Sequence, residues 1–593
     1  MHQSSPLHAE MLAFLRNHVK TKTRDIPVLI DSALQQQTSP ELEGMVQHVN
    51  RLIQENENKI ESRWLSSLSK QEFELLNLGA YYPRIYRGLP RLYHRDDPSR
   101  SIIQENFHHL HLLKLESIDR AMCSLFADVP IEGVFRLIIL THVIADDLGD
   151  YIAAIETARI LKEALPALQI TLILVSAQQL PPVEGLNIEV AQEWLSDAQI
   201  KILREADLVI QIPTFYPHTA AVLYEISQLQ SDFGPPPIVQ YISKYGYVES
   251  SWFHPKTLHR SMGLHALEKG IFTKRPLSCR FQNVENVLIL NALFGTTSPS
   301  QLTIEEYRFT HRFHLAHLAS NTGGAIFLHA LIKRWEHESL DIDICTPDLT
   351  WLMQWLSGRS QGNPLLFTCG IKEIVLVVKE GNHKITISEQ GKTLRIISPG
   401  LLSHTDMQKL MYLSDDWVAV QGDQGLSEAI ATQKPFFYDG RPPCLAFLKD
   451  LIALATNRLS AYKPTIEIFQ AMKESLLWNL PETTDIWVDE THFQMKEKKD
   501  IATLAAMVGD ALRHPTTSAG YKHLSAIVTS EHSFNPFLTS LVRRELFYRL
   551  HPHLKSETDQ WLELYGKGEI NLTTLVKNIQ KSQLQNGFAR KNR

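Results

Sequence analysis

The sequence has few cysteines, and their spacing predicts neither a disulfide framework nor a zinc site. Its 593 residues include five cysteines that are widely spaced and free of any CxxC pair: Cys123, Cys279, Cys345, Cys369 and Cys444. The chain also lacks an apolar run of about 18 residues and a charged-then-apolar N-terminal signal. We therefore expect a reducing, cytoplasmic location, with no membrane span and no Sec export.

A strong net charge is absent as well. The formal net charge is −6, and Lys and Arg are dispersed along the chain, whereas a nucleic-acid surface needs a basic face. Histidine is frequent, with 26 residues, but His108, His109 and His111 do not place three ligands on one face of a helix. We expect no nucleic-acid partner, no metal and no cofactor.

What the sequence does contain is a change of pattern along its length. Residues 1–128 show helical spacing, whereas 131–280 and 284–480 alternate short apolar runs with amphipathic stretches. Residues 481–593 look helical again, with a polar end from Gln580 that we expect to be frayed. The predicted fold class is α/β: two Rossmann-like domains in series, with a helical N-terminal extension and a helical C-terminal region.

The predicted strands fall into two series. Those of the first domain are Leu137–Ile144, Thr171–Val175, Leu208–Ile212 and Ile238–Ile242. Those of the second domain are Val287–Leu290, Ile342–Cys345, Ile374–Val378, Thr393–Ile397, Trp417–Val420 and Phe436–Tyr438.

The segment from Val418 to Asp439 is the most informative stretch. A short apolar strand runs into Gly422, and a helix follows that ends before a second short strand. Such a turn points backbone N–H groups at a phosphate. Glu428, in the first helical turns, could accept hydrogen bonds from a ribose diol. The alternative is an ordinary strand–turn–helix with Glu428 on a solvated face.

A second chemical element follows the first predicted strand, where Asp146, Asp147 and Asp150 lie within five residues. Ligands bind at the carboxyl ends of strands in open α/β sheets, and a carboxylate there could remove a proton from an acceptor nucleophile. The alternative is that one aspartate caps the following helix while the others are solvated.

Together these two elements resemble the protein-arginine rhamnosyltransferases that modify bacterial elongation factor P. That family ends its first strand in D-N-Y-G-D-I-G, at the places of Asp146 to Ile152 here. Its donor turn, G-E-D-S-F-V-R-A, matches Gly422 to Ala429 without a gap, with Lys434-Pro435 in register. The resemblance covers about residues 131–450 and leaves both helical ends unexplained.

The resemblance implies a GT-B architecture, in which two Rossmann-like domains face each other across a cleft. It implies metal-independent, inverting transfer of a sugar from a nucleotide-sugar to a protein, on an arginine in that family. By carry-over, Asp150 is the general base, Asp146 its essential neighbour, and Asp423 the essential acid of the donor turn. The expected donor-binding residues are Gly422, Gln424, Gly425, Ser427 and Glu428.

Departures from the family leave the substrates open. The arginine before the donor glycine is Gln421 here, which weakens attraction for a diphosphate. Glu428 instead matches the spacing of the lipid II-forming GlcNAc transferase, so both thymidine and uridine diphosphate sugars stay candidates. Tyr241 and Ser243 are candidates for the acceptor cleft, with core packing as the alternative for the tyrosine.

Three other functions remain open. One is a catalytically degenerate GT-B protein that binds a nucleotide or a partner. The others are transfer to a non-protein acceptor and transfer to a host protein, with the chain acting as a bacterial effector delivered by a non-Sec route.

Overall fold

The computed structural model describes residues 119, 123–143, 148–177, 180, 183–192, 194–213, 217–228, 235–245, 259–264, 268–318, 320–352, 370–440, 445–478, 501–566, 570 and 572–588. Most of the predicted helical domain 1–128 lies outside these residues, as do the three histidines considered above and Asp146.

The first domain is a six-stranded sheet in the order β3-β2-β1-β4-β5-β6, with every pair parallel. Its strands are β1 (Phe135–Val143), β2 (Leu168–Ser176), β3 (Asn187–Ala191), β4 (Leu208–Gln211), β5 (Ile238–Tyr245) and β6 (His259–Met262). Its helices are α7 (Gly149–Ala164), α8 (Asp197–Arg204) and α9 (Pro217–Gln228). All four predicted strands are confirmed. The pattern missed β3 and β6, which are short edge-side strands without an apolar run.

The second domain repeats this design. Its main sheet has the order β10-β9-β11-β8-β7, and a parallel bridge from Ala316 to Ala419 sets the β12-β13 pair beside β7. The strands are β7 (His311–Leu315), β8 (Asp341–Cys345), β9 (Ile371–Val378), β10 (Gly381–Thr386), β11 (Lys392–Ile397), β12 (Val418–Val420) and β13 (Phe436–Tyr438). Only the pairing of β10 with β9 is antiparallel among these strands.

The predicted strand Val287–Leu290 is wrong, because these residues begin helix α10 (Val287–Phe294). Asn286 caps the helix by accepting from the Ile289 N–H at 3.1 Å, and Gly295 ends it in the left-handed conformation. A short, continuously apolar run does not distinguish a strand from a buried helix, and here the caps decided. The first strand of the domain is β7 instead, whose polar residues disguise it in the sequence.

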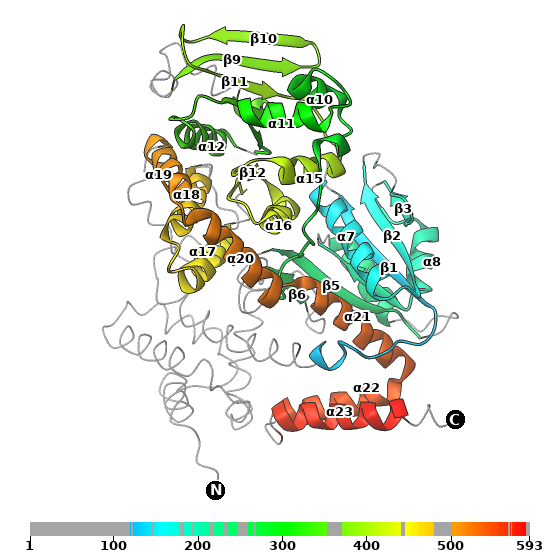
Figure 1. The fold of residues 1–593 in the computed structure, drawn as a ribbon. Helices are drawn as coiled ribbons and strands as arrows, with labels where there is room; N and C mark the ends of the chain where they lie inside the picture. The colour runs from blue at the N-terminus through cyan, green and yellow to red at the C-terminus, as the bar shows by residue number, and fades with distance from the viewer. Residues whose placement is uncertain are drawn as a thin grey trace, which may run out of the picture.

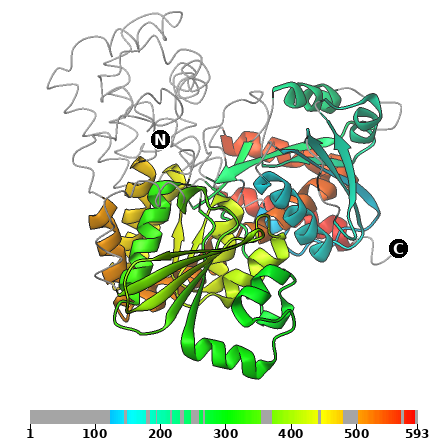
Figure 2. The ribbon, with the colours of Figure 1, turned by 90° about the horizontal axis from the view of Figure 1, so that it is seen from above.

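The helices of the second half surround this sheet and then cross to the first domain (Figures 1 and 2). They are α11 (Gln301–Thr310), α12 (Asn321–Arg334), α15 (His404–Leu413), α16 (Gly422–Thr432), α17 (Leu445–Arg458), α18 (Lys463–Trp478), α19 (Ile501–Arg513), α20 (Thr517–Glu531), α21 (Phe534–Leu550), α22 (Pro552–Gly566) and α23 (Leu572–Phe588). Helix α19 packs on α12, and α21 packs on α7. The chain was expected to be frayed from Gln580 onward, but α23 continues through Gln580 and ends at Phe588.

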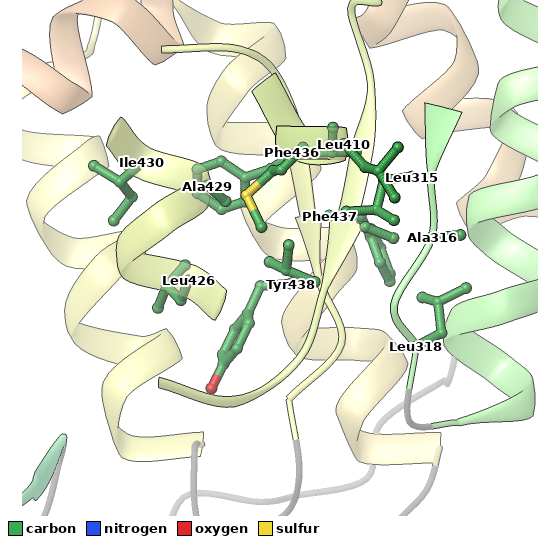
Figure 3. Close-up of a cluster of buried hydrophobic side chains, with 14 of the residues drawn as sticks. Leu315, Ala316, Leu318, Leu410, Leu426, Ala429, Ile430, Phe436, Phe437 and Tyr438 are labelled. Carbon is green, nitrogen blue, oxygen red and sulfur yellow. The ribbon is translucent and has the colours of Figure 1, made fainter. Parts of the chain in front are cut away.

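These elements confirm the predicted GT-B fold class of two Rossmann-like α/β domains. The core of the second domain lies between α16, β13 and β7 (Figure 3). Leu426 from α16, Phe437 from β13 and Leu315 from β7 are fully buried in it. Burying an apolar side chain of this size stabilises a fold by roughly 1.5–3 kcal/mol, so this core fixes where α16 begins.

The start of the described chain is part of the first domain rather than an independent unit. Asp119 is buried and pairs with Arg260 of β6 at 2.8 Å, with Lys269 at 3.0 Å and with Arg544 of α21 at 2.9 Å. Phe126 is also buried, and its ring packs against Phe547 at 5.4 Å between centroids. Three buried cations therefore share one carboxylate from the end of the predicted N-terminal domain, and Arg544 has Glu545 as a second acidic partner at 2.6 Å.

Candidate functional site

Both sheets have a topological switch point, where the strand order reverses. In the first sheet the chain passes from β1 to β2 on one side and later returns to β4 on the other side of β1. In the second domain it passes from β7 to β8 on one side and later returns to β12 on the other side of β7. Ligands of open α/β sheets bind outside the carboxyl ends of the strands at such points. This rule selects the segments after β1, β4, β7 and β12.

In the second domain the segments after β7 and β12 meet directly. The His317 N–H donates to the Ala419 carbonyl at 2.9 Å, and the His317 ring lies 2.6 Å from the Gln421 side-chain nitrogen. Gln421 immediately precedes α16, and His317 lies shortly before α12. The N-termini of both helices therefore lie at the same switch point.

Helix α12 begins with its N-terminus closed by protein side chains. The Ser320 hydroxyl accepts from the Gly323 N–H at 2.9 Å, so it caps the helix. The buried carboxylate of Asp439 accepts from the Ser320 N–H at 2.7 Å and from its hydroxyl at 2.8 Å. A Cβ at Gly323 would lie 2.4 Å from Asp439, so this glycine is required for the close approach. An anion of the protein already occupies this helix end.

Helix α16, the predicted donor turn, begins differently. Its N-cap residue Gln421 makes no side-chain hydrogen bond to the first turn. Gly422 has φ +72°, a conformation that side chains with a Cβ rarely adopt, and a Cβ built there would meet no atom within 4 Å. The first N–H groups of a helix have no intrahelical partner and carry partial positive charge. This end therefore has both the space and the electrostatics for an anionic ligand.

Two residues of the donor turn contact the first domain instead of pointing away from it. The Asp423 carboxylate accepts from the Tyr245 N–H at 3.3 Å, and the Ser427 hydroxyl lies 2.6 Å from the Tyr245 hydroxyl. Tyr245 ends β5, so the carboxyl edge of the first sheet meets the N-terminus of α16. Helix α7, which follows β1 at that same edge, also packs against α16.

Glu428 is buried, so the alternative of a solvated face is wrong. Its Oε1 accepts from the Gln408 amide at 2.7 Å and pairs with His404 at 3.1 Å. Gln424 donates to the same oxygen at 3.1 Å. Burial raises the pKa of Glu428, but the hydrogen bond and charge of His404, with Lys274 and Gln408, lower that pKa below its ordinary value. The carboxylate stays charged inside a set of protein partners.

Lys274 links Glu428 to the first domain. Its ammonium lies 2.5 Å from the Glu156 carboxylate of α7 and 3.9 Å from Glu428 of α16. All three side chains are largely buried, with exposures of 14% for Lys274, 13% for Glu156 and 5% for Glu428. The cation therefore offsets two acids that would otherwise repel each other across the domain boundary.

Asp150 lies in the first turn of α7 and is only 2% exposed. The N-cap position of this helix is Leu148, which has no side-chain capping group. Capping by Asp150 itself therefore does not explain the buried acid. Strands β1 and β5 are separated only by β4, so their ends lie about 10 Å apart at the edge that α16 contacts. Asp150 thus follows β1 at this edge, and Asp423 of α16 contacts the edge through Tyr245 at the end of β5, whereas Asp146 lies outside the described residues.

The acceptor-side candidates Tyr241 and Ser243 both lie on β5 and are buried. Tyr241 packs in the core beside α9, and burial raises its pKa to about 12. The Ser243 hydroxyl donates to the Arg260 carbonyl at 3.4 Å. Core packing accounts for the position of Tyr241, as the alternative interpretation held.

Sequence reasoning missed His317, Ser320 and Asp439 as members of this region, whereas Tyr245 is one of the aromatic residues near Tyr241 that the sequence offers for the acceptor cleft. After β7, the sequence singles out only Gly323-Gly324 and the apolar helix that follows as a segment that could meet the cleft. The available signal was a serine three residues before Gly323, which is a capping arrangement. His142, hydrogen-bonded to Thr219 at 2.5 Å and buried near the end of β1, was missed for the same lack of a local pattern.

Three further observations concern metal ligands, cysteines and membrane-spanning helices. Among the described residues, no group of three His, Cys, Asp or Glu side chains is placed to hold a metal ion. Cys123, Cys279 and Cys345 are free thiols. None of the described helices is both long enough and apolar enough to cross a membrane.

Solved structures with some similarity to this chain include several glycosyltransferases. A family 9 glycosyl transferase from Veillonella parvula is 12% identical, with 51% of this chain and 80% of that chain covered and a TM-score of 0.28. The heptosyltransferase WaaC of E. coli with ADP is 11% identical, covering 54% and 98%, with a TM-score of 0.25. An O-GlcNAc transferase from Thermobaculum terrenum is 11% identical, covering 93% and 100%, with a TM-score of 0.30.

With TM-scores below 0.5, these similarities define neither the substrate nor the mechanism of this chain. No protein-family model matches the sequence, and no curated protein matches it.

Proposed function

We propose that this protein is a glycosyltransferase that moves a sugar from a nucleotide-sugar to an acceptor, with the donor diphosphate at the N-terminus of α16. The observation that carries the proposal is the contact between the carboxyl edge of the first sheet and the start of α16, made by Tyr245 with Asp423 and Ser427. One region offers an uncapped helix end, and the other offers the buried acid Asp150. This combination supplies an anion site and a base on opposite sides of one boundary.

The reaction follows from these two parts. Asp150 accepts a proton from the acceptor, and the acceptor atom forms a bond to the anomeric carbon of the sugar. The bond from that carbon to the diphosphate oxygen breaks, and its electron pair leaves with the diphosphate. The N–H groups of the first turn of α16 stabilise the leaving charge, so the step proceeds without a metal. Attack from the face opposite the diphosphate inverts the anomeric centre.

The acceptor we propose is a protein, with an arginine side chain as the specific candidate. A charged guanidinium is a poor nucleophile, so a carboxylate has to orient it and take up its proton during attack. A host protein and a non-protein hydroxyl acceptor need the same base and the same donor site. Uridine and thymidine diphosphate sugars are the two donor classes that we propose, from the spacing of Gly422, Glu428 and Pro435 in the donor turn.

A non-catalytic nucleotide-binding protein is the second candidate. It is favoured by Glu428, whose Oε1 already accepts hydrogen bonds from Gln408 and Gln424. A carboxylate with these partners serves the fold, so a nucleotide held at the start of α16 would lack the ribose contact that positions a donor for transfer.

Asp150→Asn tests the choice between the two. Thermal shifts with uridine and thymidine diphosphates first measure binding, and release of nucleotide from the matching sugar donors then measures turnover. We expect the variant to lose turnover by roughly 10²–10⁴-fold, as for removal of a general base, with nucleotide affinity within a few-fold. Turnover equal to that of the wild type removes Asp150 from the mechanism.

Two variants control this experiment. Glu163→Gln removes an acid from the same helix, where its exposed side chain pairs with exposed Arg275, and it should leave turnover unchanged. Asp150→Glu keeps the carboxylate but changes its packing, so it shows whether a loss of turnover comes from the missing base or from disturbed packing around this buried position. Nucleotide binding without any turnover in the wild type supports the non-catalytic candidate, and no shift with any nucleotide refutes both.

A further inference from the structure

Tyr245 lies at the boundary between the two domains, and its side chain is 2% exposed. Its ring stacks on Phe447 of α17 at 5.4 Å between centroids, with a 30° interplanar angle. The side chain therefore leaves the first sheet at the end of β5 and inserts into the second domain.

The hydrogen bonds of Tyr245 form a chain with one direction. The Phe272 N–H donates to the Tyr245 hydroxyl at 3.1 Å, so the tyrosine oxygen acts as an acceptor there. The Ser427 hydroxyl donates to the Asp423 carbonyl at 3.1 Å, which leaves the Tyr245 hydroxyl to donate to Ser427 at 2.6 Å. Burial first, and the charge of Asp423 second, raise the pKa of Tyr245 far above its usual value, so the hydroxyl keeps its proton.

The main chain of Tyr245 also contacts the start of α16. Its N–H donates to the Asp423 carboxylate at 3.3 Å, while its side chain reaches the Asp423 carbonyl through Ser427. One residue of the first domain thus fixes both the main chain and the side chain of Asp423.

A local irregularity in β5 directs the tyrosine to this place. Residues two apart in a strand share a face, so Tyr245 should face the same side as Tyr241 and Ser243. The register with β6 shifts between Ser243 and Tyr245, and a bulge of this kind re-aims a side chain. As a result Tyr241 packs in the core beside α9, whereas Tyr245 packs in the core that α16 shares.

We propose that Tyr245 is a positioning residue whose hydroxyl holds the first turn of α16 at the reacting distance from the acceptor side. The inference rests on the proposed function. Displacement of a reacting group by about 1 Å can reduce a rate by as much as 10²-fold. The hydroxyl contacts α16 behind its open N-terminus, so its loss should impair turnover far more than nucleotide binding.

The test compares Tyr245→Phe, Ser427→Ala and the double variant in the full-length chain. Calorimetry with uridine and thymidine diphosphates gives Kd, and nucleotide release from UDP-glucose and from thymidine diphosphate rhamnose gives kcat. For Tyr245→Phe we expect kcat to fall at least tenfold and Kd to change less than threefold. The double variant should be about as slow as the slower single variant, because both substitutions break the same chain of hydrogen bonds.

Tyr307→Phe is the matched control. Tyr307 is buried within the second domain, where its hydroxyl donates to Asp343 at 2.6 Å, away from the domain boundary. Like Tyr245→Phe, the Tyr307→Phe variant loses a hydroxyl oxygen from a buried ring, and it should leave kcat within twofold of the wild type. A kcat for Tyr245→Phe within twofold of the wild type overturns the proposal, and so does a Kd that weakens as much as kcat.

Hydrogen exchange of the ligand-free protein separates this inference from the proposed function. Tyr245→Phe frees the Phe272 N–H and should accelerate exchange there and at the first hydrogen-bonded N–H groups of α16, in its second turn, by roughly five- to tenfold. Unchanged exchange overturns the role of the hydroxyl, whatever the activity. A wild type that binds neither nucleotide refutes the proposed function. If exchange in Tyr245→Phe is nevertheless accelerated, Tyr245 only links the two domains, and its proposed role in transfer is overturned as well.

Discussion

Helices α12 and α16 begin on neighbouring strands at one switch point, yet one N-terminus is closed and the other is open. In α12, Ser320 caps the first turn, and Asp439 places a negative charge against it. In α16, Gln421 turns to His317 and leaves its own helix uncapped. Among the described residues, the two helix starts therefore differ in their side-chain caps, and the start of α16 without a cap is the one that the proposed diphosphate site requires.

The fourth residues of the two helices make this comparison testable. Gly324 of α12 and Gly425 of α16 occupy the same position after their N-caps. A Cβ at Gly324 would lie 2.4 Å from the buried ring of Trp351, whereas a Cβ at Gly425 would lie at an ordinary 3.5 Å from Val420. The glycine of α12 is therefore required by packing, and the glycine of α16 is not.

The largest effect on stability is expected from Gly324→Ala. The added methyl group has to displace Trp351, and overpacking of this kind costs about 1–3 kcal/mol, more than the helix propensity that alanine adds. Urea unfolding followed by tryptophan fluorescence measures the loss. A variant as stable as the wild type would show that the start of α12 packs less tightly against Trp351 than the structure indicates.

An intermediate effect is expected from closing α16 artificially with Gln421→Asp. The residue before Gly422 has extended backbone angles that suit a capping side chain, and the new carboxylate repels a diphosphate. We expect affinity for uridine and thymidine diphosphates to fall at least tenfold, about 1.4 kcal/mol, while stability without nucleotide is kept or raised. Calorimetry and thermal unfolding measure the two quantities.

Gln421→Ser separates the cap from the charge. Serine can cap the turn without repelling an anion, so it should weaken nucleotide binding less than aspartate does. Equal affinities for the wild type and both variants would mean that no diphosphate binds at this helix end.

The smallest effect, opposite in sign, is expected from Gly425→Ala. Alanine in place of glycine within a helix stabilises by roughly 0.5–1 kcal/mol where there is room for the methyl group. Thermal unfolding should therefore show a raised Tm, in contrast to Gly324→Ala. A destabilisation equal to that of Gly324→Ala would remove the difference between the two helix ends.

The sequence predicted the elements whose signals are local. Strands β12 and β13 are apolar runs, and Gly422 after β12 marks a turn with a positive φ, so the strand–turn–helix of the donor region could be recognised before its surroundings were known. The same logic failed for α10, because an apolar run of its length fits a buried strand equally well.

The environment of the site residues was not predictable in this way. The solvated face considered for Glu428 is wrong, because the residue is buried among side chains from α15 and from the segment after β6, and ribose binding by Glu428 stays a prediction. Helical periodicity tells which residues share a face and not which partners arrive from far along the chain. Asp119 shows the same limit, because its three cationic partners lie at least 141 residues away.

What the sequence determined by itself is the succession of elements and the position of a glycine turn and an acidic strand end, since both depend on neighbours within a few residues. The tertiary structure alone decided that Asp150 and the contact of Tyr245 with Asp423 lie at one edge of the first sheet, and that α12 has a side-chain cap while α16 has none. These features depend on strand order, on a bulge in β5 and on side chains such as Asp439 that approach from distant elements. Short-range patterns carry no information about such approaches, because they arise only when the two sheets are assembled and packed.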